Sequence, residues 1–267
     1  MVGAAVVGIL VVAAILAPLI ARYDPTALVA GPLELPSASH PLGTNDLGQD
    51  VLAQLIWGAR TSLTVAVGAA GIALSLAVLF GVGSALVGGW LESASARLMD
   101  VFLAMPLLPL LVLIAALVGP NRGSLVLVIG LMSWAGPGRV LRSQTLSVRH
   151  RGFVRASRGF GGGLGYVLRR HVLPALGPLL VSGFVSVAGH AVLLEAGLAF
   201  LGLADPTSVS WGLMLNRALL QQGLYFSPEW TWWVLPAGLA ITLAILGFTF
   251  VGVGIESVFN VRMRRAS

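Results

Sequence analysis

Long apolar stretches separated by a few charged residues dominate the chain. An α-helix needs about 20 apolar residues to cross the hydrocarbon core of a bilayer. Six intervals carry no charged residue, and they lie between Met1 and Arg22, Arg60 and Glu92, Asp100 and Arg122, Arg122 and Arg139, Arg170 and Glu195, and Glu229 and Glu256. We therefore expect six transmembrane helices, at residues 1–21 and at about 62–88, 99–120, 123–143, 172–202 and 231–255.

The first and fourth intervals are the two whose assignment as transmembrane helices needs further argument. The first, "MVGAAVVGILVVAAILAPLIA", lacks a basic leading region, and its apolar run is longer than the roughly 7 to 15 residues of a signal peptide, so we expect a retained span. The fourth leaves only Gly123 to Gly138 uncharged. Arg139 and Arg142 are therefore expected at its end, where they would snorkel or line an aqueous cavity.

The composition agrees with a polytopic membrane protein. The 267 residues are 57% hydrophobic and 10% charged, with a mean hydropathy of +0.93, whereas soluble domains are about a quarter charged. One membrane domain therefore accounts for the chain. Although the pI is 11.2, the arginines are confined to short loops between apolar runs, which argues against nucleic-acid binding. Without cysteine there are no disulfides and no thiol chemistry.

Arginine placement predicts the orientation, because cytoplasmic loops of membrane proteins carry an excess of basic residues. If residues 139–170 are cytoplasmic, six spans put both termini and twelve arginines inside, and leave only Arg22, Arg60, Arg122 and Arg217 outside. The expected external segments are 22–60 and 202–230, which are rich in Pro, Gly and Asp. The expected cytoplasmic segments are the loop 144–171 and the tail 256–267.

Few residues suggest chemistry within this chain. All 16 basic residues are arginine, so no phosphate-binding loop with a Walker lysine can exist. The four histidines are too scattered for a short-range metal site, and no G-x-S-x-G nucleophile elbow is present. We therefore expect no catalytic residue, no bound metal and no cofactor. The tryptophans near the sixth span, expected as interfacial anchors, are Trp211, Trp230, Trp232 and Trp233.

Two ionisable residues, His190 and Glu195, fall inside the fifth span. Their spacing of five residues puts them about 140° apart on a helix, so they are not an obvious proton relay. Each could hydrogen-bond a neighbouring helix or lie near the interface, or could take part in transport.

A glycine-rich stretch, "RGFGGGLGYVLRRHVLP", occupies residues 158–174. Residues 153–160 can form two helical turns, and Gly161 is then well placed as a C-cap in the left-handed conformation. A second helix begins near Tyr166, and Pro174 bends or starts the next one. Such a helix, turn and helix suits insertion into a partner's groove. The alternative is a flexible amphipathic loop that lies on anionic lipid.

This stretch resembles the EAA loop of ABC importer permeases, whose pattern ends in His-Val-Leu-Pro. Arg155-Ala156-Ser157 stands where Glu-Ala-Ala is commonest, so the glutamate is missing. The resemblance implies an ATPase-coupling site made of Val154, Arg155, Ala156, Ser157, Gly161, His171, Val172, Leu173 and Pro174.

Two further stretches narrow the resemblance. "HPLGTNDLGQDVLAQLIWGARTSL", residues 40–63, looks like the HPLGTDxLGRDxLSRLIYGARxSL signature of dipeptide, oligopeptide and nickel permease subunits, with Gln49 and Ala53 as its main departures. "EAGLAFLGLADPTSVSWGLML", residues 195–215, is similar to a second signature of these subunits. The resemblance runs from about residue 40 to 260.

The resemblance implies an all-α, type I ABC importer permease fold, with a permease core at residues 61–260, in the cytoplasmic (inner) membrane. The implied partners are a homologous second permease subunit, two ABC ATPase subunits and an extracytoplasmic solute-binding protein. The implied function is ATP-driven import of peptides or a related small solute, with hydrolysis on the ATPases. Two alternatives stay open: a non-transporting receptor or assembly subunit, and an ion-coupled secondary transporter, although neither inverted repeats nor paired intramembrane charges stand out.

Overall fold

The computed structural model describes residues 2–259, and within them the chain is helical apart from its loops and one isolated bridge between Thr44 and Asp50. The helical elements, in chain order, are α1 (Val2–Ile20), α2 (Val51–Leu76), the π-helix η1 (Ala77–Gly83), α3 (Ser84–Val87), α4 (Gly89–Ala104), α5 (Leu107–Val118), α6 (Arg122–Met132), α7 (Ala135–Val148), α8 (Gly152–Gly159), α9 (Leu164–Val167), the π-helix η2 (Leu168–Val172), α10 (Leu173–Phe200), α11 (Trp211–Leu220), the 3-10 helix η3 (Leu224–Phe226) and α12 (Trp230–Phe259).

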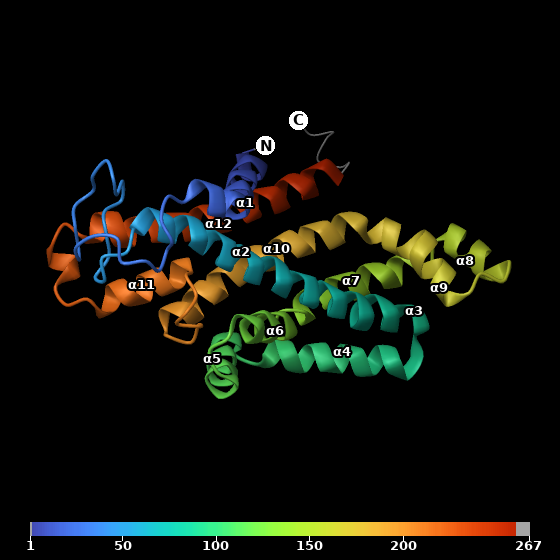
Figure 1. Ribbon diagram of the computed structural model, residues 1–267. Coiled ribbons are helices and arrows are strands. Elements are labelled where there is room, and N and C mark those ends of the chain that lie inside the picture. The colour runs from blue at the N-terminus through green and yellow to red at the C-terminus, as the bar shows by residue number, and fades with distance from the viewer. Residues whose placement is uncertain (1, 260–267) are drawn as a thin grey trace.

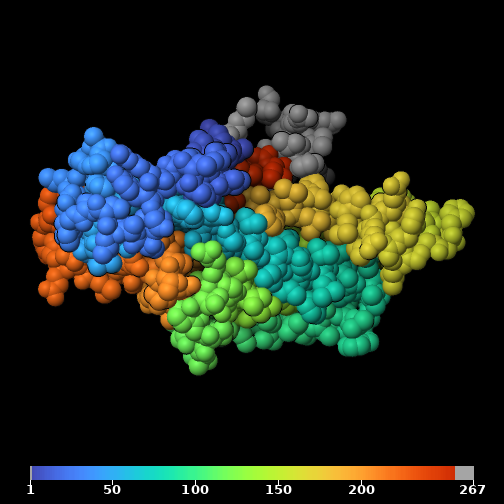
Figure 2. Space-filling model, viewed as in Figure 1, coloured from blue at the N-terminus to red at the C-terminus, as the bar shows by residue number. Residues whose placement is uncertain are grey.

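Long helices run side by side along the molecule, and loops gather at its two ends (Figure 1). α10 packs against both α2 and α12, and α1 packs against α2 and α12. One end, which we call the cap, consists of residues 21–50 and 201–229, including α11. The other end carries α8 and α9, which project from the bundle (Figure 2). The two ends are therefore separated by the length of the helices.

Four helical stretches are long and apolar enough to cross a membrane, and two bent pairs bring the number to six if each pair is one span. The unbroken stretches are 2–20, 51–87, 164–200 and 230–255. The bent pairs are α4 with α5, at 89°, and α6 with α7, at 41°. This all-helical architecture agrees with the fold class expected from the sequence.

The bounds of the third span differ from the expected 99–120. α4 already begins at Gly89, and the helix breaks at Met105, whose backbone is extended (φ −76°, ψ 138°). Pro106 explains the break, since a proline disfavours helical backbone in the residue before it. α5 then starts after Pro106 in a new direction.

The second and fourth spans also depart from expectation. α2 starts at Val51, within the expected external segment 22–60, because Asp50 caps it by accepting a hydrogen bond from the Ala53 amide. The expected span 123–143 is two helices joined at Ser133 and Trp134. Of its arginines, Arg139 pairs with Asp100, and Arg142 pairs with Glu92 at 2.8 Å.

The fifth and sixth spans are longer than expected. The helix expected at 172–202 begins at Leu164, so the expected loop 144–171 shrinks to the residues between the end of α7 and the start of α9. The π-helix η2 leads directly into α10, and Pro174 follows it within the first turn, where a missing amide proton costs least. α12 continues to Phe259, and the rest of the expected tail, residues 260–267, lies outside the described residues.

Small residues allow close packing at the centre of the bundle. Ala66, Ala69, Ala70 and Ala73 of α2 are fully buried. They recur at a helical spacing of three or four, so they form one face of α2. Small side chains let helix backbones approach closely in membranes, where van der Waals packing supplies much of the association energy.

Candidate functional site

The short helix α8 ends in a Schellman turn. The Gly162 amide donates to the Ser157 carbonyl at 2.8 Å, and the Gly161 amide donates to the Arg158 carbonyl at 3.0 Å. This pair of bonds defines the motif, which needs a left-handed residue between helix and loop. Gly161 has φ +86°, so the left-handed C-cap expected at this position is confirmed.

Exposed aromatic side chains surround this turn. Phe160 is 93% exposed, and Phe153 and Tyr166 are about half exposed. Phe160, Tyr166 and the glycines of the turn border an open hollow of about 560 Å³. Large apolar side chains that gather on a projecting surface are typical of a protein-protein contact.

His171 joins the two helices that flank the turn. Its ring lies 5.7 Å from the ring of Phe153 on α8 and 5.7 Å from the ring of Tyr166 on α9. Such ring contacts add to the apolar area that each side chain buries. His171 therefore contacts both α8 and α9.

Polar contacts tie this end to the neighbouring helices. Arg149 donates to the Ala85 carbonyl at 2.8 Å and lies 3.5 Å from Glu92, which also pairs with Arg142. Arg158 of α8 reaches the Leu86 carbonyl at 3.3 Å. The Glu92 pairs are only partly exposed, so water screens them less than surface pairs. Arg158 therefore connects α8 to α3, and the Glu92 pairs connect α4 to α7 and to the residue that follows it.

The structure gathers the residues of the predicted coupling site around α8 and the start of α10, but with different exposures. Arg155, Ala156, Gly161 and Pro174 are exposed; Ser157, His171 and Leu173 are partly exposed; Val154 and Val172 are buried. The buried valines anchor the segment to the bundle. The sequence pattern did not single out Phe153, Phe160 and Tyr166, although all three aromatics lie beside the glycine run.

Gly162 differs from the other glycines of the run. A Cβ atom on Gly162 would lie 2.7 Å from the Ser157 carbonyl oxygen and 2.7 Å from its Oγ atom, whereas Gly163 and Gly165 have open space at that position. The sequence motif singled out only Gly161. Position 162 has no room for a side chain because the hydrogen bond from the Gly162 amide to the Ser157 carbonyl brings this residue against the last turn of α8.

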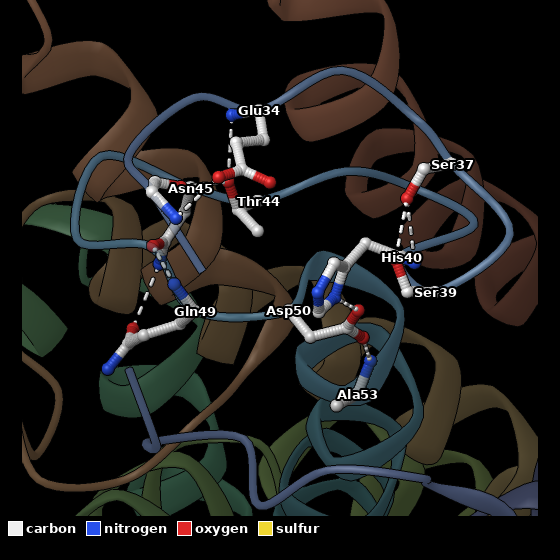
Figure 3. Close-up of polar contacts among 10 residues, drawn as sticks. Glu34, Ser37, Ser39, His40, Thr44, Asn45, Gln49, Asp50 and Ala53 are labelled. Atoms are coloured by element: carbon white, nitrogen blue, oxygen red, sulfur yellow. Dashed lines mark hydrogen bonds and ion pairs between the residues drawn. The ribbon is translucent and has the colours of Figure 1, made fainter. Parts of the chain in front are cut away.

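The stretch 40–63 forms much of the cap. His40 Nδ1 lies 2.9 Å from Asp50 Oδ2, and the His40 ring stacks on Tyr23. Asn45 and Gln49 lie beside them in a buried polar network (Figure 3). The hydrogen-bonded groups fix the loop in one conformation at the start of α2.

The departure at Gln49 has a structural explanation. The permease signature that residues 40–63 resemble carries Asp and Arg where this chain carries Asn45 and Gln49. Asn45 Nδ2 donates to Gln49 Oε1 at 2.9 Å, and Gln54 Nε2 donates to the same oxygen at 2.7 Å. Gln49 therefore accepts two side-chain hydrogen bonds within the buried network of the cap.

The stretch 195–215 packs directly against the stretch 40–63. Ser62 Oγ donates to Glu195 Oε2 at 2.9 Å, and Trp211 Nε1 donates to the Leu55 carbonyl at 2.9 Å. Trp211 is fully buried. The two signature stretches, more than 100 residues apart in sequence, therefore form one contact between α2, α10 and α11 at the cap.

Glu195 makes structural hydrogen bonds in this contact. It is 1% exposed, and its carboxylate accepts a hydrogen bond from the Ser62 hydroxyl. We expect Glu195→Gln to keep most transport activity, because the amide oxygen can still accept the hydrogen bond from Ser62. Glu195→Leu should reduce the amount of folded protein, since the buried Ser62 hydroxyl would lose its acceptor at about 1–3 kcal/mol. Size-exclusion chromatography and uptake assays check both, and loss of transport in the normally folded Gln variant would contradict the structural role.

The tryptophans expected as interfacial anchors occupy a different position. Trp211, Trp232 and Trp233 are buried within the protein, and only Trp230 is exposed, at 38%. A side chain that packs between helices cannot contact lipid headgroups, so the expectation was wrong for the first three. Trp211 packs against Gly58 of α2, and Trp232 packs against Gly43 of the cap.

Two carboxyl groups of the cap have shifted pKa values. Burial raises the pKa of Asp46 above its usual value, and the nearby charge of Arg217 only partly offsets this effect. The hydroxyl of Thr207, 2.6 Å from Asp205 Oδ1, holds the pKa of Asp205 below its usual value. Within the described residues no three His, Asp or Glu side chains lie where they could hold a metal ion.

Comparisons with known proteins agree with this geometry. Residues 73–265 match the family model described as "Binding-protein-dependent transport system inner membrane component". A protein of Brucella suis biovar 1, named as a candidate peptide permease, is 40% identical over 85% of this chain and 74% of its own length. The dipeptide transport system permease protein DppC of Alkalihalophilus pseudofirmus is 32% identical over 97% of this chain and 86% of its own length. The nickel transport system permease protein NikC of Escherichia coli is 34% identical over 86% of this chain and 82% of its own length.

The family match covers most of the chain, and it includes the α8 turn and the spans around it. The apolar helices, the two signature stretches and the relatives agree with one another. The chain therefore belongs to the family of binding-protein-dependent transport system inner membrane components, the permease subunits of ABC importers, and is a multi-pass membrane protein.

Proposed function

We propose that this chain forms half of the translocation path of an ATP-driven importer for peptides or a related small solute. The main structural support is the projecting α8 turn, with its Schellman geometry and exposed aromatics, at the opposite end of the bundle from the cap. Relatives named as dipeptide, oligopeptide and nickel permeases support the solute class.

The two ends of the molecule suit different partners. The α8 turn would enter a groove of an ABC ATPase subunit, and the cap would receive an extracytoplasmic solute-binding protein. A homologous permease subunit would complete the path, and a second ATPase would serve that subunit. Hydrolysis of ATP would occur on the ATPases, and ATP would act as a ligand that binds one state of the complex better than the other.

Arg155 indicates which charge the ATPase surface would carry at this contact. Arg151, Arg155 and Arg169 are exposed near the turn, whereas the related loops most often carry a glutamate at the position of Arg155. A groove that receives this loop would therefore offer acidic side chains, because exposed charges of opposite sign favour and orient association.

The orientation can be tested directly, because the chain has no native cysteine. Single cysteines at the exposed positions Ser39 and Thr207 of the cap should react with a membrane-impermeant maleimide applied to intact cells. A cysteine at the exposed Ser147 of α7 should react only after the membrane is opened. Reaction of Ser147→Cys in intact cells would reverse the proposed topology.

Reconstitution tests the function itself. Proteoliposomes that contain this chain, its second permease subunit and the ATPases should accumulate a labelled dipeptide only with ATP on the ATPase side and loaded binding protein on the other. Omission of this chain should abolish accumulation. Uptake driven by an ion gradient without ATP would favour a secondary transporter, and hydrolysis without uptake would favour a non-transporting subunit.

A further inference from the structure

The two ionisable residues of α10 lie in different surroundings. Glu195 is buried against Ser62, whereas His190 is exposed. His190 lies within the apolar helical stretch 164–200, ten residues before its end at Phe200. An ionisable side chain within a membrane-crossing helix normally faces the bundle interior or a water-filled cavity. An exposed histidine here therefore indicates a surface that lipid does not cover.

A groove of about 280 Å³ runs between α10 and α12 at this place. Its polar lining consists of Ser182, Ser186 and His190 from α10 and Thr249 from α12. Gly252 opens one wall, since a Cβ atom there would meet only Val185 Cγ1, at 3.9 Å. The lining contains no acidic residue and no arginine.

The hydrogen bonds of the groove leave acceptors free. His190 Nδ1 lies 2.8 Å from the Ser186 carbonyl, and because a carbonyl only accepts, Nδ1 must carry a proton. In the neutral ring Nε2 is then an acceptor. The Thr249 hydroxyl donates to the Ile245 carbonyl at 2.8 Å, and the Ser182 hydroxyl donates to the Leu179 carbonyl at 3.4 Å. Their protons are used within the helices, so their remaining capacity is to accept.

We propose that this groove is a solute-binding site on the translocation path and that it takes a group that donates hydrogen bonds, such as the ammonium or amide groups of a short peptide. The inference rests on the proposed function and adds a location and a ligand chemistry. A carboxylate or phosphate would find no arginine in the lining. His190 Nε2 is the central acceptor, and Gly252 provides the room beside it.

Accessibility to water tests the location. Single cysteines at Ser186 and His190, in the complete complex, should react with a charged, water-soluble thiol reagent in at least one nucleotide state, and a transported peptide should slow the reaction about tenfold or more at saturation. Ala188→Cys is the matched control, since Ala188 lies on α10 but is fully buried. If neither cysteine reacts with or without ATP, while the same complex still shows ATP-dependent uptake, the path lies elsewhere and the proposed function stands.

Transport kinetics test the ligand chemistry. His190→Leu, which removes the acceptor, should raise KM for a dipeptide about tenfold, with little change in kcat, whereas His190→Gln should restore much of the affinity because its amide oxygen accepts. Gly252→Leu should raise KM by filling the groove, whereas Gly238→Leu, on the same helix with open space at its Cβ position, should not. Wild-type KM in both His190→Leu and Gly252→Leu would overturn the proposal.

Discussion

Gly162→Val should abolish most coupled transport while the protein still inserts and assembles with its second permease subunit. A Cβ atom at this position would lie 2.7 Å from the Ser157 carbonyl oxygen, so the Schellman turn must open or α8 must shift. Overpacking of this kind typically costs about 1–3 kcal/mol. Since 1.4 kcal/mol is tenfold in an equilibrium, the equilibrium constant for the properly formed turn should fall about 5- to 150-fold. Uptake in proteoliposomes and ATPase retention during purification measure the effect.

Variants of neighbouring glycines provide the matched comparison. Gly161→Asp should act in the same direction as Gly162→Val, because its backbone has φ +86°, a conformation that costs about 1 kcal/mol or more with a β-carbon. Gly165→Ala should leave coupling unchanged, since its Cβ position is open and alanine favours helix α9. Full uptake by Gly162→Val with a loss in Gly165→Ala would show that the turn is not the coupling element.

Gly212→Val should remove most of the folded protein. A Cβ atom on Gly212 would lie 2.5 Å from the Ala196 carbonyl oxygen and 2.8 Å from the Ala199 Cβ. These atoms belong to α10, which cannot move without disturbing the contact of Glu195 with Ser62. We expect α11 to be forced off α10, at a cost of about 1–3 kcal/mol or more. Fluorescence-detected size-exclusion chromatography and thermal unfolding in detergent measure the loss.

Gly197→Val is the control for this prediction. Gly197 lies on α10, one residue after Ala196, but a Cβ atom there has open space. Its substitution should therefore change the amount of folded protein far less than that of Gly212. Equal amounts of folded protein in the two variants would mean that the contact between α10 and α11 does not stabilise the cap as described.

Much of the architecture could be predicted from the sequence, because charge-free apolar runs report directly on membrane-crossing helices. The apolar pattern does not record where a helix bends inside such a run. Pro106 explains the break between α4 and α5, but the 89° angle depends on packing with other helices. Likewise, Pro174 was expected to bend or start a helix, and it lies in the first turn of α10, but the sequence pattern did not indicate that the π-helix η2 joins α10 without a break.

The candidate site could be predicted only in part, for a similar reason. The left-handed Gly161 followed from local backbone geometry, which a short sequence determines. The need for glycine at position 162, the anchoring of Arg158 on Leu86 and the exposure of Phe160 depend on how α8 returns to the bundle. The same holds for the tryptophans, since composition alone cannot distinguish Trp233 in a packed core from a tryptophan at the membrane surface.

The most direct test of the account is ATP-dependent uptake of a labelled dipeptide into proteoliposomes, with wild-type chain and the Gly162→Val variant compared in otherwise identical complexes. The account predicts uptake by the wild type that requires both ATP and loaded binding protein, and a loss of uptake in the variant despite intact permease assembly. Uptake that is independent of ATP, or equal in the two complexes, would contradict the claim that this chain couples an ATPase to transport through the α8 turn.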